Sequence, residues 1–236
     1  MDVESKQMME AVENPVEVQI NGYHFVTGTL DGYPVVISKT QIGMVNAALV
    51  TALAVQTYQP LCVINQGTAG GHDPALHQGD IVIGETTYNI NSFKNEHRDE
   101  GAGMAPESWI WRPTETYLNG EWVENDALHS DAKLVKIAQT VPYAAGKVVP
   151  GVIGSGDVWN KEIDRINQIH AAFNTSCEEM ETYAVAQVCQ QLNVPFLGLR
   201  VLSNSELHAE DFDPATALAC QTYAVDVAKA IIAAQK

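Results

Sequence analysis

Three short apolar runs, each followed by glycine or small polar residues, constrain the fold of this 236-residue chain more than any other feature. Runs of Val, Ile, Leu and Phe without polar alternation are typical of strands that are buried on both faces, as in a parallel sheet. Ligands of such α/β sheets bind beyond the carboxyl ends of the strands, so a ligand site is predicted where these runs end. The runs are LCVINQ before GTAGG (61–71), KVVPGVIG before SGD (147–157) and VPFLGLRVLS before NSE (194–206).

The remaining pattern places hairpin strands first and helices later. Residues 16–30 alternate apolar and polar side chains like a strand, and the DG pair at 31–32 indicates a hairpin that leads into 33–39. Another strand is expected at 79–88, and helices at 43–58, 129–141, after the glutamates at 178–181, and at 214–234. This order predicts a single α/β domain over 1–236, with a mixed central β-sheet flanked by helices.

Composition excludes several classes of partner. The net charge of −16 argues against nucleic acid, whose binding depends on clustered Lys and Arg. No run approaches the roughly 18 apolar residues of a membrane span, and the polar start MDVESKQMME does not resemble a signal peptide, so a cytoplasmic protein is expected. The four cysteines lack metal-binding spacing, so buried free thiols and no metal site are predicted.

The stretch SCEEMETYAVAQVC (176–189) crowds three glutamates before an apolar helix. Acidic residues in a first helical turn are stabilised by the helix dipole, by about 0.3–1 kcal/mol each. Alternatively, one of these carboxylates points into a pocket. The stretch alone leaves both interpretations open.

The order and spacing of six motifs resemble the purine nucleoside phosphorylase and nucleosidase superfamily, most closely the methylthioadenosine/S-adenosylhomocysteine nucleosidases. The resemblance implies an N-ribosyl hydrolase of purine nucleosides that takes part in nucleoside catabolism and methionine salvage, forms a homodimer and needs no cofactor. It covers the chain from about residue 2, and residues 89–125, which contain three tryptophans, are the most divergent part and a candidate interface or pocket wall. The motifs are IGMVNAA (42–48), INQGTAGG (64–71), QGDIVIG (78–84), SGDVW (155–159), EEMETYAVAQVC (178–189) and VPFLGLRVLSN (194–204).

The resemblance assigns a role to one glutamate of the acidic stretch. It implies that Glu181 binds the ribose hydroxyls and that Met180 packs against the sugar. A carboxylate can accept hydrogen bonds from two neighbouring hydroxyls, and it places negative charge near a carbon that becomes cationic as the glycosidic bond breaks. The helix-dipole interpretation is kept for Glu178, and Glu179 has no assigned role.

Four further positions match site residues of the family. Glu4 corresponds to the base that deprotonates the attacking water, and Thr68 to a hydroxyl near the reaction centre. Trp159 corresponds to the aromatic that stacks on the purine, and Ile42 to the apolar wall beside the 5′ substituent. The alternatives are a solvated Glu4, a turn residue at Thr68, a packing Trp159 and a core Ile42. The family also has a strand of about eight residues before the Glu4 position. That strand either lies outside this numbering, or the chain is truncated or rearranged; a missing inner strand would leave unpaired backbone groups and an exposed sheet edge.

One position departs from the family at the purine base. The nucleosidases have Asp after the last inner strand, where it protonates purine N7, whereas this chain has Asn204. Asn donates and accepts hydrogen bonds but supplies no proton. The substrate is then a 6-oxopurine nucleoside, or another carboxylate is the acid, or the protein binds nucleosides with little turnover. The candidate acids are Glu206, Glu210 and Asp211.

Water is favoured over phosphate as the nucleophile. A phosphorylase needs cations for phosphate, and its relatives have an Arg two residues before the first Gly of the glycine-rich segment. This chain has Asn65 there, and the cations Lys6 and Lys39 are isolated in the sequence. A phosphorylase and a nucleoside-binding protein without activity remain the alternatives.

Overall fold

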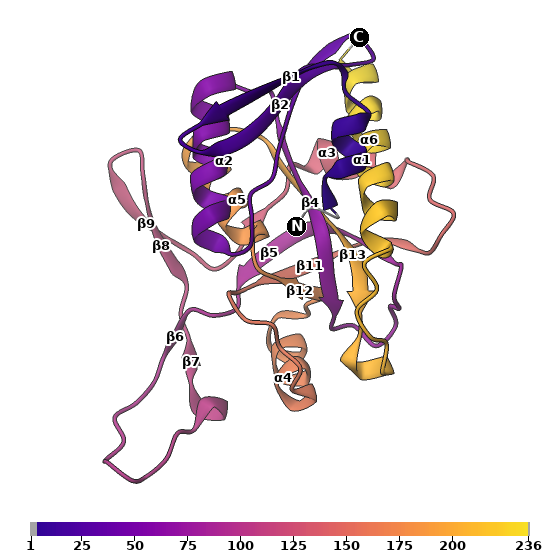
Figure 1. The fold of residues 1–236 in the computed structure, drawn as a ribbon. Coiled ribbons are helices and arrows are strands. Elements are labelled where there is room, and N and C mark those ends of the chain that lie inside the picture. The colour runs from indigo at the N-terminus through magenta and orange to yellow at the C-terminus, as the bar shows by residue number, and fades with distance from the viewer. Residues whose placement is uncertain (1–3, 236) are drawn as a thin grey trace.

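The computed structural model describes residues 4–235 as helices packed around a closed central sheet, with a second small sheet beside it (Figure 1). The helices are α1 (Lys6–Glu10), α2 (Met44–Tyr58), α3 (Ala132–Gln139), α4 (Ile163–Phe173), α5 (Thr182–Gln191) and α6 (Thr216–Ala233), with 3-10 turns η2 (Pro106–Ser108) and η3 (Glu206–His208). The strands of the two main sheets are β1 (Glu13–Ile20), β2 (Tyr23–Leu30), β3 (Tyr33–Ser38), β4 (Val63–Gly71), β5 (Ile81–Asn89), β10 (Leu128–His129), β11 (Val148–Ser155), β12 (Cys177–Glu179) and β13 (Phe196–Asn204).

The predicted mixed central sheet is confirmed, and it closes on itself. Its order is β10-β5-β11-β12-β4-β13, and β13 also pairs with β5, so five of the strands form a ring. The pairs β5–β11, β11–β12 and β4–β13 are parallel, whereas β12–β4 and β13–β5 are antiparallel. The barrel has little interior space: a Cβ at Gly84 of β5 would overlap the side chain of Ile153 on β11. A larger residue at position 84 would therefore force the Ile153 side chain to move.

The glycine-rich segment GTAGG does not follow the strand but is part of it. It continues β4, where residues 63–70 pair with β13 and Gly70 and Gly71 pair with β12. The glycines do not reverse the chain here. They let side chains from β12 and β13 lie directly against the backbone of β4.

The small sheet is an antiparallel meander in the order β1-β2-β3. Residues 16–30 were expected to form one strand, but they belong to two strands joined at Asn21-Gly22. Asn21 and Gly22 have φ values of 50° and 84°, and Asp31 and Gly32 have 50° and 77°, so both turns have the positive φ pair of a type I′ hairpin. The NG pair was the signal that separates the strands.

An open slot separates the meander from the barrel. Within residues 4–235, β3 pairs only with β2, and residues 63–69 of β4 pair only with β13. Both free edges line one cavity, which also includes the strand-end site described below. Within residues 4–235, the unpaired sheet edge expected from the sequence is therefore present.

Helices cover the barrel on opposite sides. On one side α6 and α3 pack on β4, β5 and β13 around Ile83, Leu134 and Tyr223. On the other side α5 packs on the barrel and α2 packs on α5, around Ala47, Tyr183 and Phe196. The helices predicted at 43–58, 129–141 and 214–234 are thus confirmed as α2, α3 and α6.

Residues 89–125 form two hairpins that project away from the barrel (Figure 1). Their strands are β6 (Phe93–Lys94) with β7 (Ile110–Trp111), and β8 (Thr114–Leu118) with β9 (Glu121–Asn125). Large apolar side chains are exposed on them, including Trp109, Tyr117 and Trp122. Patches of this kind are typical of a protein interface.

All four cysteines are unpaired, as predicted: Cys62 is half-buried, and Cys177, Cys189 and Cys220 are buried. In the part of the chain that the structure describes, no helix is both long and apolar enough to cross a membrane. Nor does any group of three His, Cys, Asp or Glu side chains in that part have the geometry to hold a metal ion.

Candidate active site

The structure brings the seven residues singled out in the sequence to one cavity of about 1150 Å³. Its polar end lies where β4, β11, β12 and β13 meet, and its other end is the slot between β3 and β4. The volume exceeds that of a single ligand pocket because the slot is included. The seven residues are Glu4, Ile42, Thr68, Trp159, Met180, Glu181 and Asn204.

Glu4 is held against β4 rather than solvated. Its Oε1 accepts hydrogen bonds from the Thr68 backbone N–H at 2.8 Å and from the Thr68 hydroxyl at 2.9 Å. A Cβ at Gly67 would lie 3.1 Å from Glu4 Oε1 and 3.6 Å from Arg200 Cζ, so glycine lets these groups approach. Burial raises the pKa of Glu4, but positive charge and hydrogen bonds, those from Thr68 among them, outweigh it and lower the pKa below its usual value.

Glu181 lies at the N-cap position of α5, where the chain leaves β12. Its Oε1 accepts a hydrogen bond from the backbone N–H of Gly43 at 2.9 Å, and its Oε2 lies 3.9 Å from Arg200 Nη2. Burial and the neighbouring charge of Glu179 together raise the pKa of Glu181 to about 7, although Arg200 and Gly43 oppose the shift. A side chain that is 19% exposed in this setting faces the cavity, not bulk solvent.

The three glutamates of the acidic stretch do not share a helix. Glu178 and Glu179 lie on β12, where consecutive side chains point to opposite faces, and only Glu181 borders α5. The helix-dipole interpretation of Glu178 was therefore wrong. Glu178 and Glu179 are both buried, in different polar networks.

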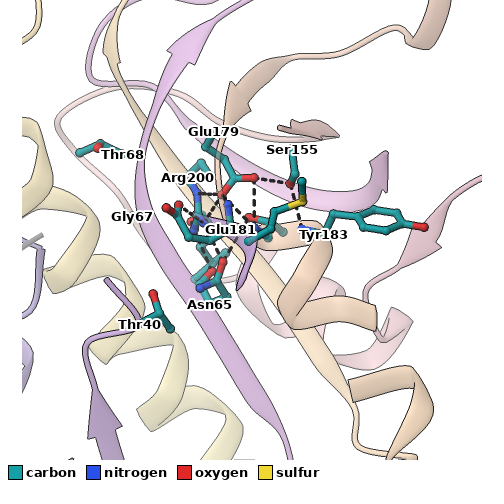
Figure 2. Close-up of polar contacts among 12 residues, drawn as sticks. Thr40, Asn65, Gly67, Thr68, Ser155, Glu179, Glu181, Tyr183 and Arg200 are labelled. Atoms are coloured by element: carbon teal, nitrogen blue, oxygen red, sulfur yellow. Dashed lines mark hydrogen bonds and ion pairs between the residues drawn. The ribbon is translucent and has the colours of Figure 1, made fainter. Parts of the chain in front are cut away.

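Glu179 and Arg200 form a buried ion pair next to Glu181 (Figure 2). Arg200 Nη2 and Nε donate to Glu179 Oε2 at 2.5 and 3.1 Å, and Ser155 Oγ also donates to Glu179. The Glu179 carboxylate accepts the backbone N–H groups of Glu181 and Thr182 at 2.9 Å. Burial alone would raise the pKa of Glu179, but Arg200 and these hydrogen bonds lower it. The network fixes the backbone from which Glu181 projects.

The apolar residues lie at the mouth of the cavity. Trp159 is 58% exposed and meets Phe212 edge-to-face, with ring centroids 5.7 Å apart. Ile42 is exposed beside Gly43, and Met180 is half-buried next to Glu181. Trp159 and Ile42 are therefore not core residues, and both are available to a ligand.

Asn204 is buried at the end of β13. The Ser203 hydroxyl lies 3.0 Å from Asn204 Oδ1 and 3.2 Å from the Ala69 carbonyl oxygen, and its single proton serves only one of them. Asn204 itself lines the cavity. The three candidate acids do not line the cavity: Glu206 pairs with Lys161, and Glu210 binds His77 and the Gln78 backbone. Asp211 is also absent from the lining.

The Arg200 guanidinium of the site is not free to bind phosphate. At the position of the phosphorylase arginine, Asn65 accepts a hydrogen bond from Arg200 Nη2 at 2.6 Å. Arg200 is 1% exposed and donates to Glu179, to Asn65 and to the backbone, so its guanidinium is already occupied by protein acceptors. The paired N–H groups with which an arginine binds phosphate are therefore already bonded to protein acceptors.

The sequence reasoning missed the supporting residues. Arg200 was detectable, because an Arg within the apolar run VPFLGLRVLS is rarely buried unless paired. Ser155 and Asn65 carried no signal of their own. Asp157 was also missed: its Oδ1 accepts the backbone N–H of Met44 at 2.9 Å and holds the start of α2 at the cavity.

Comparison with known proteins identifies this combination of fold and site. The chain belongs to the phosphorylase superfamily, whose family model matches residues 2–234. Within that superfamily it is similar to 5′-methylthioadenosine/S-adenosylhomocysteine nucleosidases. It is 32% identical to the one from Tolumonas auensis, over 86% of this chain and 83% of the other. It is 35% identical to the one from Halalkalibacterium halodurans, over 86% and 82%.

A solved structure agrees with these sequence relatives. The nucleosidase from Neisseria meningitidis, in complex with methylthio-immucillin-A, superposes with a TM-score of 0.79 at 28% identity and covers 97% of this chain and 95% of that one. The fold and the relatives together define the chain as a nucleosidase, an N-glycosyl hydrolase.

Proposed function

We propose that the protein cleaves the N-glycosidic bond of purine nucleosides with water, on 5′-substituted substrates of the methylthioadenosine/S-adenosylhomocysteine type. The observation that carries this proposal is the meeting of Glu4, Thr68 and Glu181 in one cavity with the Trp159 indole. The names of the sequence relatives support the substrate class.

In the proposed reaction, Glu4 accepts a proton from the attacking water. A lowered pKa keeps its carboxylate ionised at neutral pH, and Thr68 fixes its orientation. The water oxygen forms a bond to C1′ of the ribose while the C1′–N9 bond breaks. One water is consumed, and the departing purine recovers the proton that Glu4 removed.

The sugar is bound by Glu181 and Met180. The Glu181 carboxylate accepts hydrogen bonds from the ribose hydroxyls and stabilises positive charge that develops at C1′. Ile42 forms the wall beside the 5′ substituent, and Trp159 stacks on the purine. Asn204 donates a hydrogen bond to the leaving base and cannot protonate it.

We further propose that the enzyme is a cytoplasmic homodimer. Free thiols, which persist in reducing compartments, support the cytoplasmic location.

Two exposed apolar surfaces support the dimer. One is formed by Val45 and Leu49 on α2, next to Ile42, and the other by the projecting hairpins of 89–125. In the proposed dimer those hairpins complete the pocket of the neighbour. Sedimentation equilibrium should give twice the 25.6 kDa chain mass; a monomer at all concentrations would reject the dimer.

The nucleophile is tested by omitting phosphate. Purified protein is incubated with methylthioadenosine, S-adenosylhomocysteine, adenosine and inosine, without and with phosphate, and free base is measured. We expect base release without phosphate, because the Arg200 guanidinium is occupied by Glu179 and Asn65. Strictly phosphate-dependent release would indicate a phosphorylase, and tight binding without release a nucleoside-binding protein.

The pH dependence of kcat/KM should report Glu181. Since burial raises its pKa to about 7, kcat/KM is expected to fall as the pH drops below about 7, where the carboxylate becomes protonated and accepts fewer hydroxyl hydrogen bonds. Glu4, with its lowered pKa, stays ionised over this range. Initial rates between pH 5 and pH 9 provide the measurement.

The matched variant is Glu181→Gln. It should lower kcat/KM and remove the inflection near pH 7, because the neutral amide does not titrate. An inflection that persists in Glu181→Gln would assign the titration to another group.

A further inference from the structure

A carboxylate outside the cavity holds the start of α2, which contacts Glu181. Asp157 is exposed, follows β11 and is not among the residues that line the cavity. Its Oδ1 accepts the backbone N–H of Met44 at 2.9 Å. The preceding N–H of the chain, that of Gly43, donates to Glu181 Oε1, also at 2.9 Å. Two adjacent N–H groups are thus bound by two carboxylates from different parts of the chain.

Helix α2 has no cap of its own that could fix these groups. Its N-cap residue is Gly43, which makes no side-chain cap, and no acidic residue lies in its first turn. Gly43 has a φ of 96°, and a Cβ there would lie 3.2 Å from Asp157 Oδ1. Glycine therefore permits both the backbone conformation and the close approach of the carboxylate. A carboxylate at this end of a helix is also stabilised by the helix dipole.

The loop that carries Asp157 is anchored to the barrel on both sides of that residue. The backbone N–H of Gly156 donates to the carbonyl oxygen of Glu179 at 2.9 Å. The backbone N–H of Asn160 donates to Glu178 Oε1 at 3.1 Å. Both acceptors belong to β12. Asp157 therefore ties the start of α2 to a central strand of the barrel.

This tie acts on one oxygen of the Glu181 carboxylate. Oε1 accepts the Gly43 N–H, whereas Oε2 lies 3.9 Å from Arg200 Nη2, beyond hydrogen-bond distance. A carboxylate that is fixed at one oxygen presents the other in a defined direction, which lowers the cost of orienting it on two neighbouring hydroxyls. We infer that Asp157 is a positioning residue for ribose: by binding the Met44 N–H it keeps the Gly43 N–H on Glu181.

The purine end of the cavity does not depend on the Asp157 carboxylate in the same way. Trp159 packs edge-to-face on Phe212, and the following residue, Asn160, is held by Glu178. Removal of the Asp157 carboxylate should therefore weaken the contact with the sugar and spare the contact with the base. The inference rests on the proposed function for the role of Glu181 in binding ribose.

The experiment separates the sugar from the base by the choice of ligand. Formycin A has a carbon–carbon bond between its purine-like base and ribose, so it is not hydrolysed, and adenine has no sugar. Isothermal titration calorimetry of both ligands should show that Asp157→Ala binds formycin A about tenfold more weakly than the native protein, the effect of about one hydrogen bond. Its affinity for adenine should change by less than about twofold.

Two further variants provide the controls. Asp157→Asn keeps an oxygen that can accept the Met44 N–H, so it should bind formycin A within about threefold of the native affinity. This rescue distinguishes the hydrogen bond from the charge, and it keeps the test decisive should Asp157→Ala fold poorly. Asp164→Ala, which removes an exposed aspartate from the first turn of α4, should leave both affinities unchanged.

The pH dependence of formycin A binding gives a second readout. Burial raises the pKa of Glu181, and the Gly43 N–H opposes this shift. When that N–H is no longer held, the pKa rises further, so the affinity of Asp157→Ala should begin to fall at a higher pH than that of Asp157→Asn as the solution is acidified. Both variants lack the Asp157 charge and share the other charged groups that act on Glu181, which are Glu179, Arg200 and Glu4.

Three outcomes would overturn the positioning role. They are equal weakening of formycin A and adenine in Asp157→Ala, native affinity for formycin A in that variant, and an Asp157→Asn variant that binds formycin A as weakly as Asp157→Ala. A native protein that binds adenine and not formycin A would also overturn it. None of these measurements needs turnover, so a protein that releases no base from methylthioadenosine rejects the hydrolase and leaves the test of Asp157 intact.

Discussion

Glu4→Gln is expected to lower kcat by about 10²–10⁴-fold, the usual contribution of a general acid or base. The amide retains an oxygen that can accept the Thr68 backbone N–H and hydroxyl, so the side chain keeps its position. It cannot accept the proton of the attacking water, so the loss should fall on kcat while KM changes little. Initial rates of base release from methylthioadenosine and methylthioinosine measure the effect.

This prediction has a control variant and an outcome that would contradict it. Glu10→Gln, a charge-matched change on the exposed surface of the same helix region, should retain native kcat. If Glu4→Gln retains more than about a tenth of the native kcat, Glu4 is not the base.

Arg200→Met is expected to destabilise the fold by about 3–5 kcal/mol, the cost of leaving a buried charge without its partner. Glu179 would keep its burial and lose the guanidinium that is the largest of the influences lowering its pKa. Its carboxylate would then be more costly at neutral pH than in acid, so the deficit should shrink as the pH falls and Glu179 is protonated. Urea unfolding at pH 8 and pH 5 measures both effects.

The double variant Arg200→Met with Glu179→Leu is the control. Removing both charges should recover much of the stability, because an apolar pair can replace a buried ion pair. Activity should not recover, since Glu179 accepts the backbone N–H of Glu181, the residue proposed to bind the ribose hydroxyls. If the Arg200→Met variant is as stable as the native protein, the Arg200–Glu179 ion pair does not stabilise this part of the barrel.

The strands and helices of the central domain were largely predictable, because their apolar runs are long and each element is buried on a regular face. The runs at 147–154 and 194–203 became β11 and β13, and all nine residues of β13 are buried. The closure of the barrel was not predictable. It depends on β5 pairing with both β11 and β13, and on glycines such as Gly84, where local patterns suggest a turn as readily as a close contact.

Some residues of the candidate site could also be predicted from the sequence, and others could not. Glu181 and Trp159 could be named because they belong to spaced motifs, and the structure places both in the cavity. Glu178 was misread because a strand of three residues, β12, is too short to show a period of two. Its neighbour His72 had no signal, since the pairing of β4 with β12 brings together residues more than 100 positions apart in the chain.

The slot beside β4 has a mechanical consequence. Since the meander shares no strand pairing with the barrel within residues 4–235, shifting it breaks no ladder hydrogen bond. The chain runs from β3 to Gly43 in a few residues, and the Gly43 N–H is the group that holds Glu181. If Glu181 binds ribose as proposed, the sugar competes with the Gly43 N–H for this carboxylate and so acts on the start of α2 and, through the short covalent link, on the small sheet. By thermodynamic linkage, a ligand that binds one position of the small sheet changes the affinity for the sugar by the same factor by which the sugar changes the affinity for that ligand.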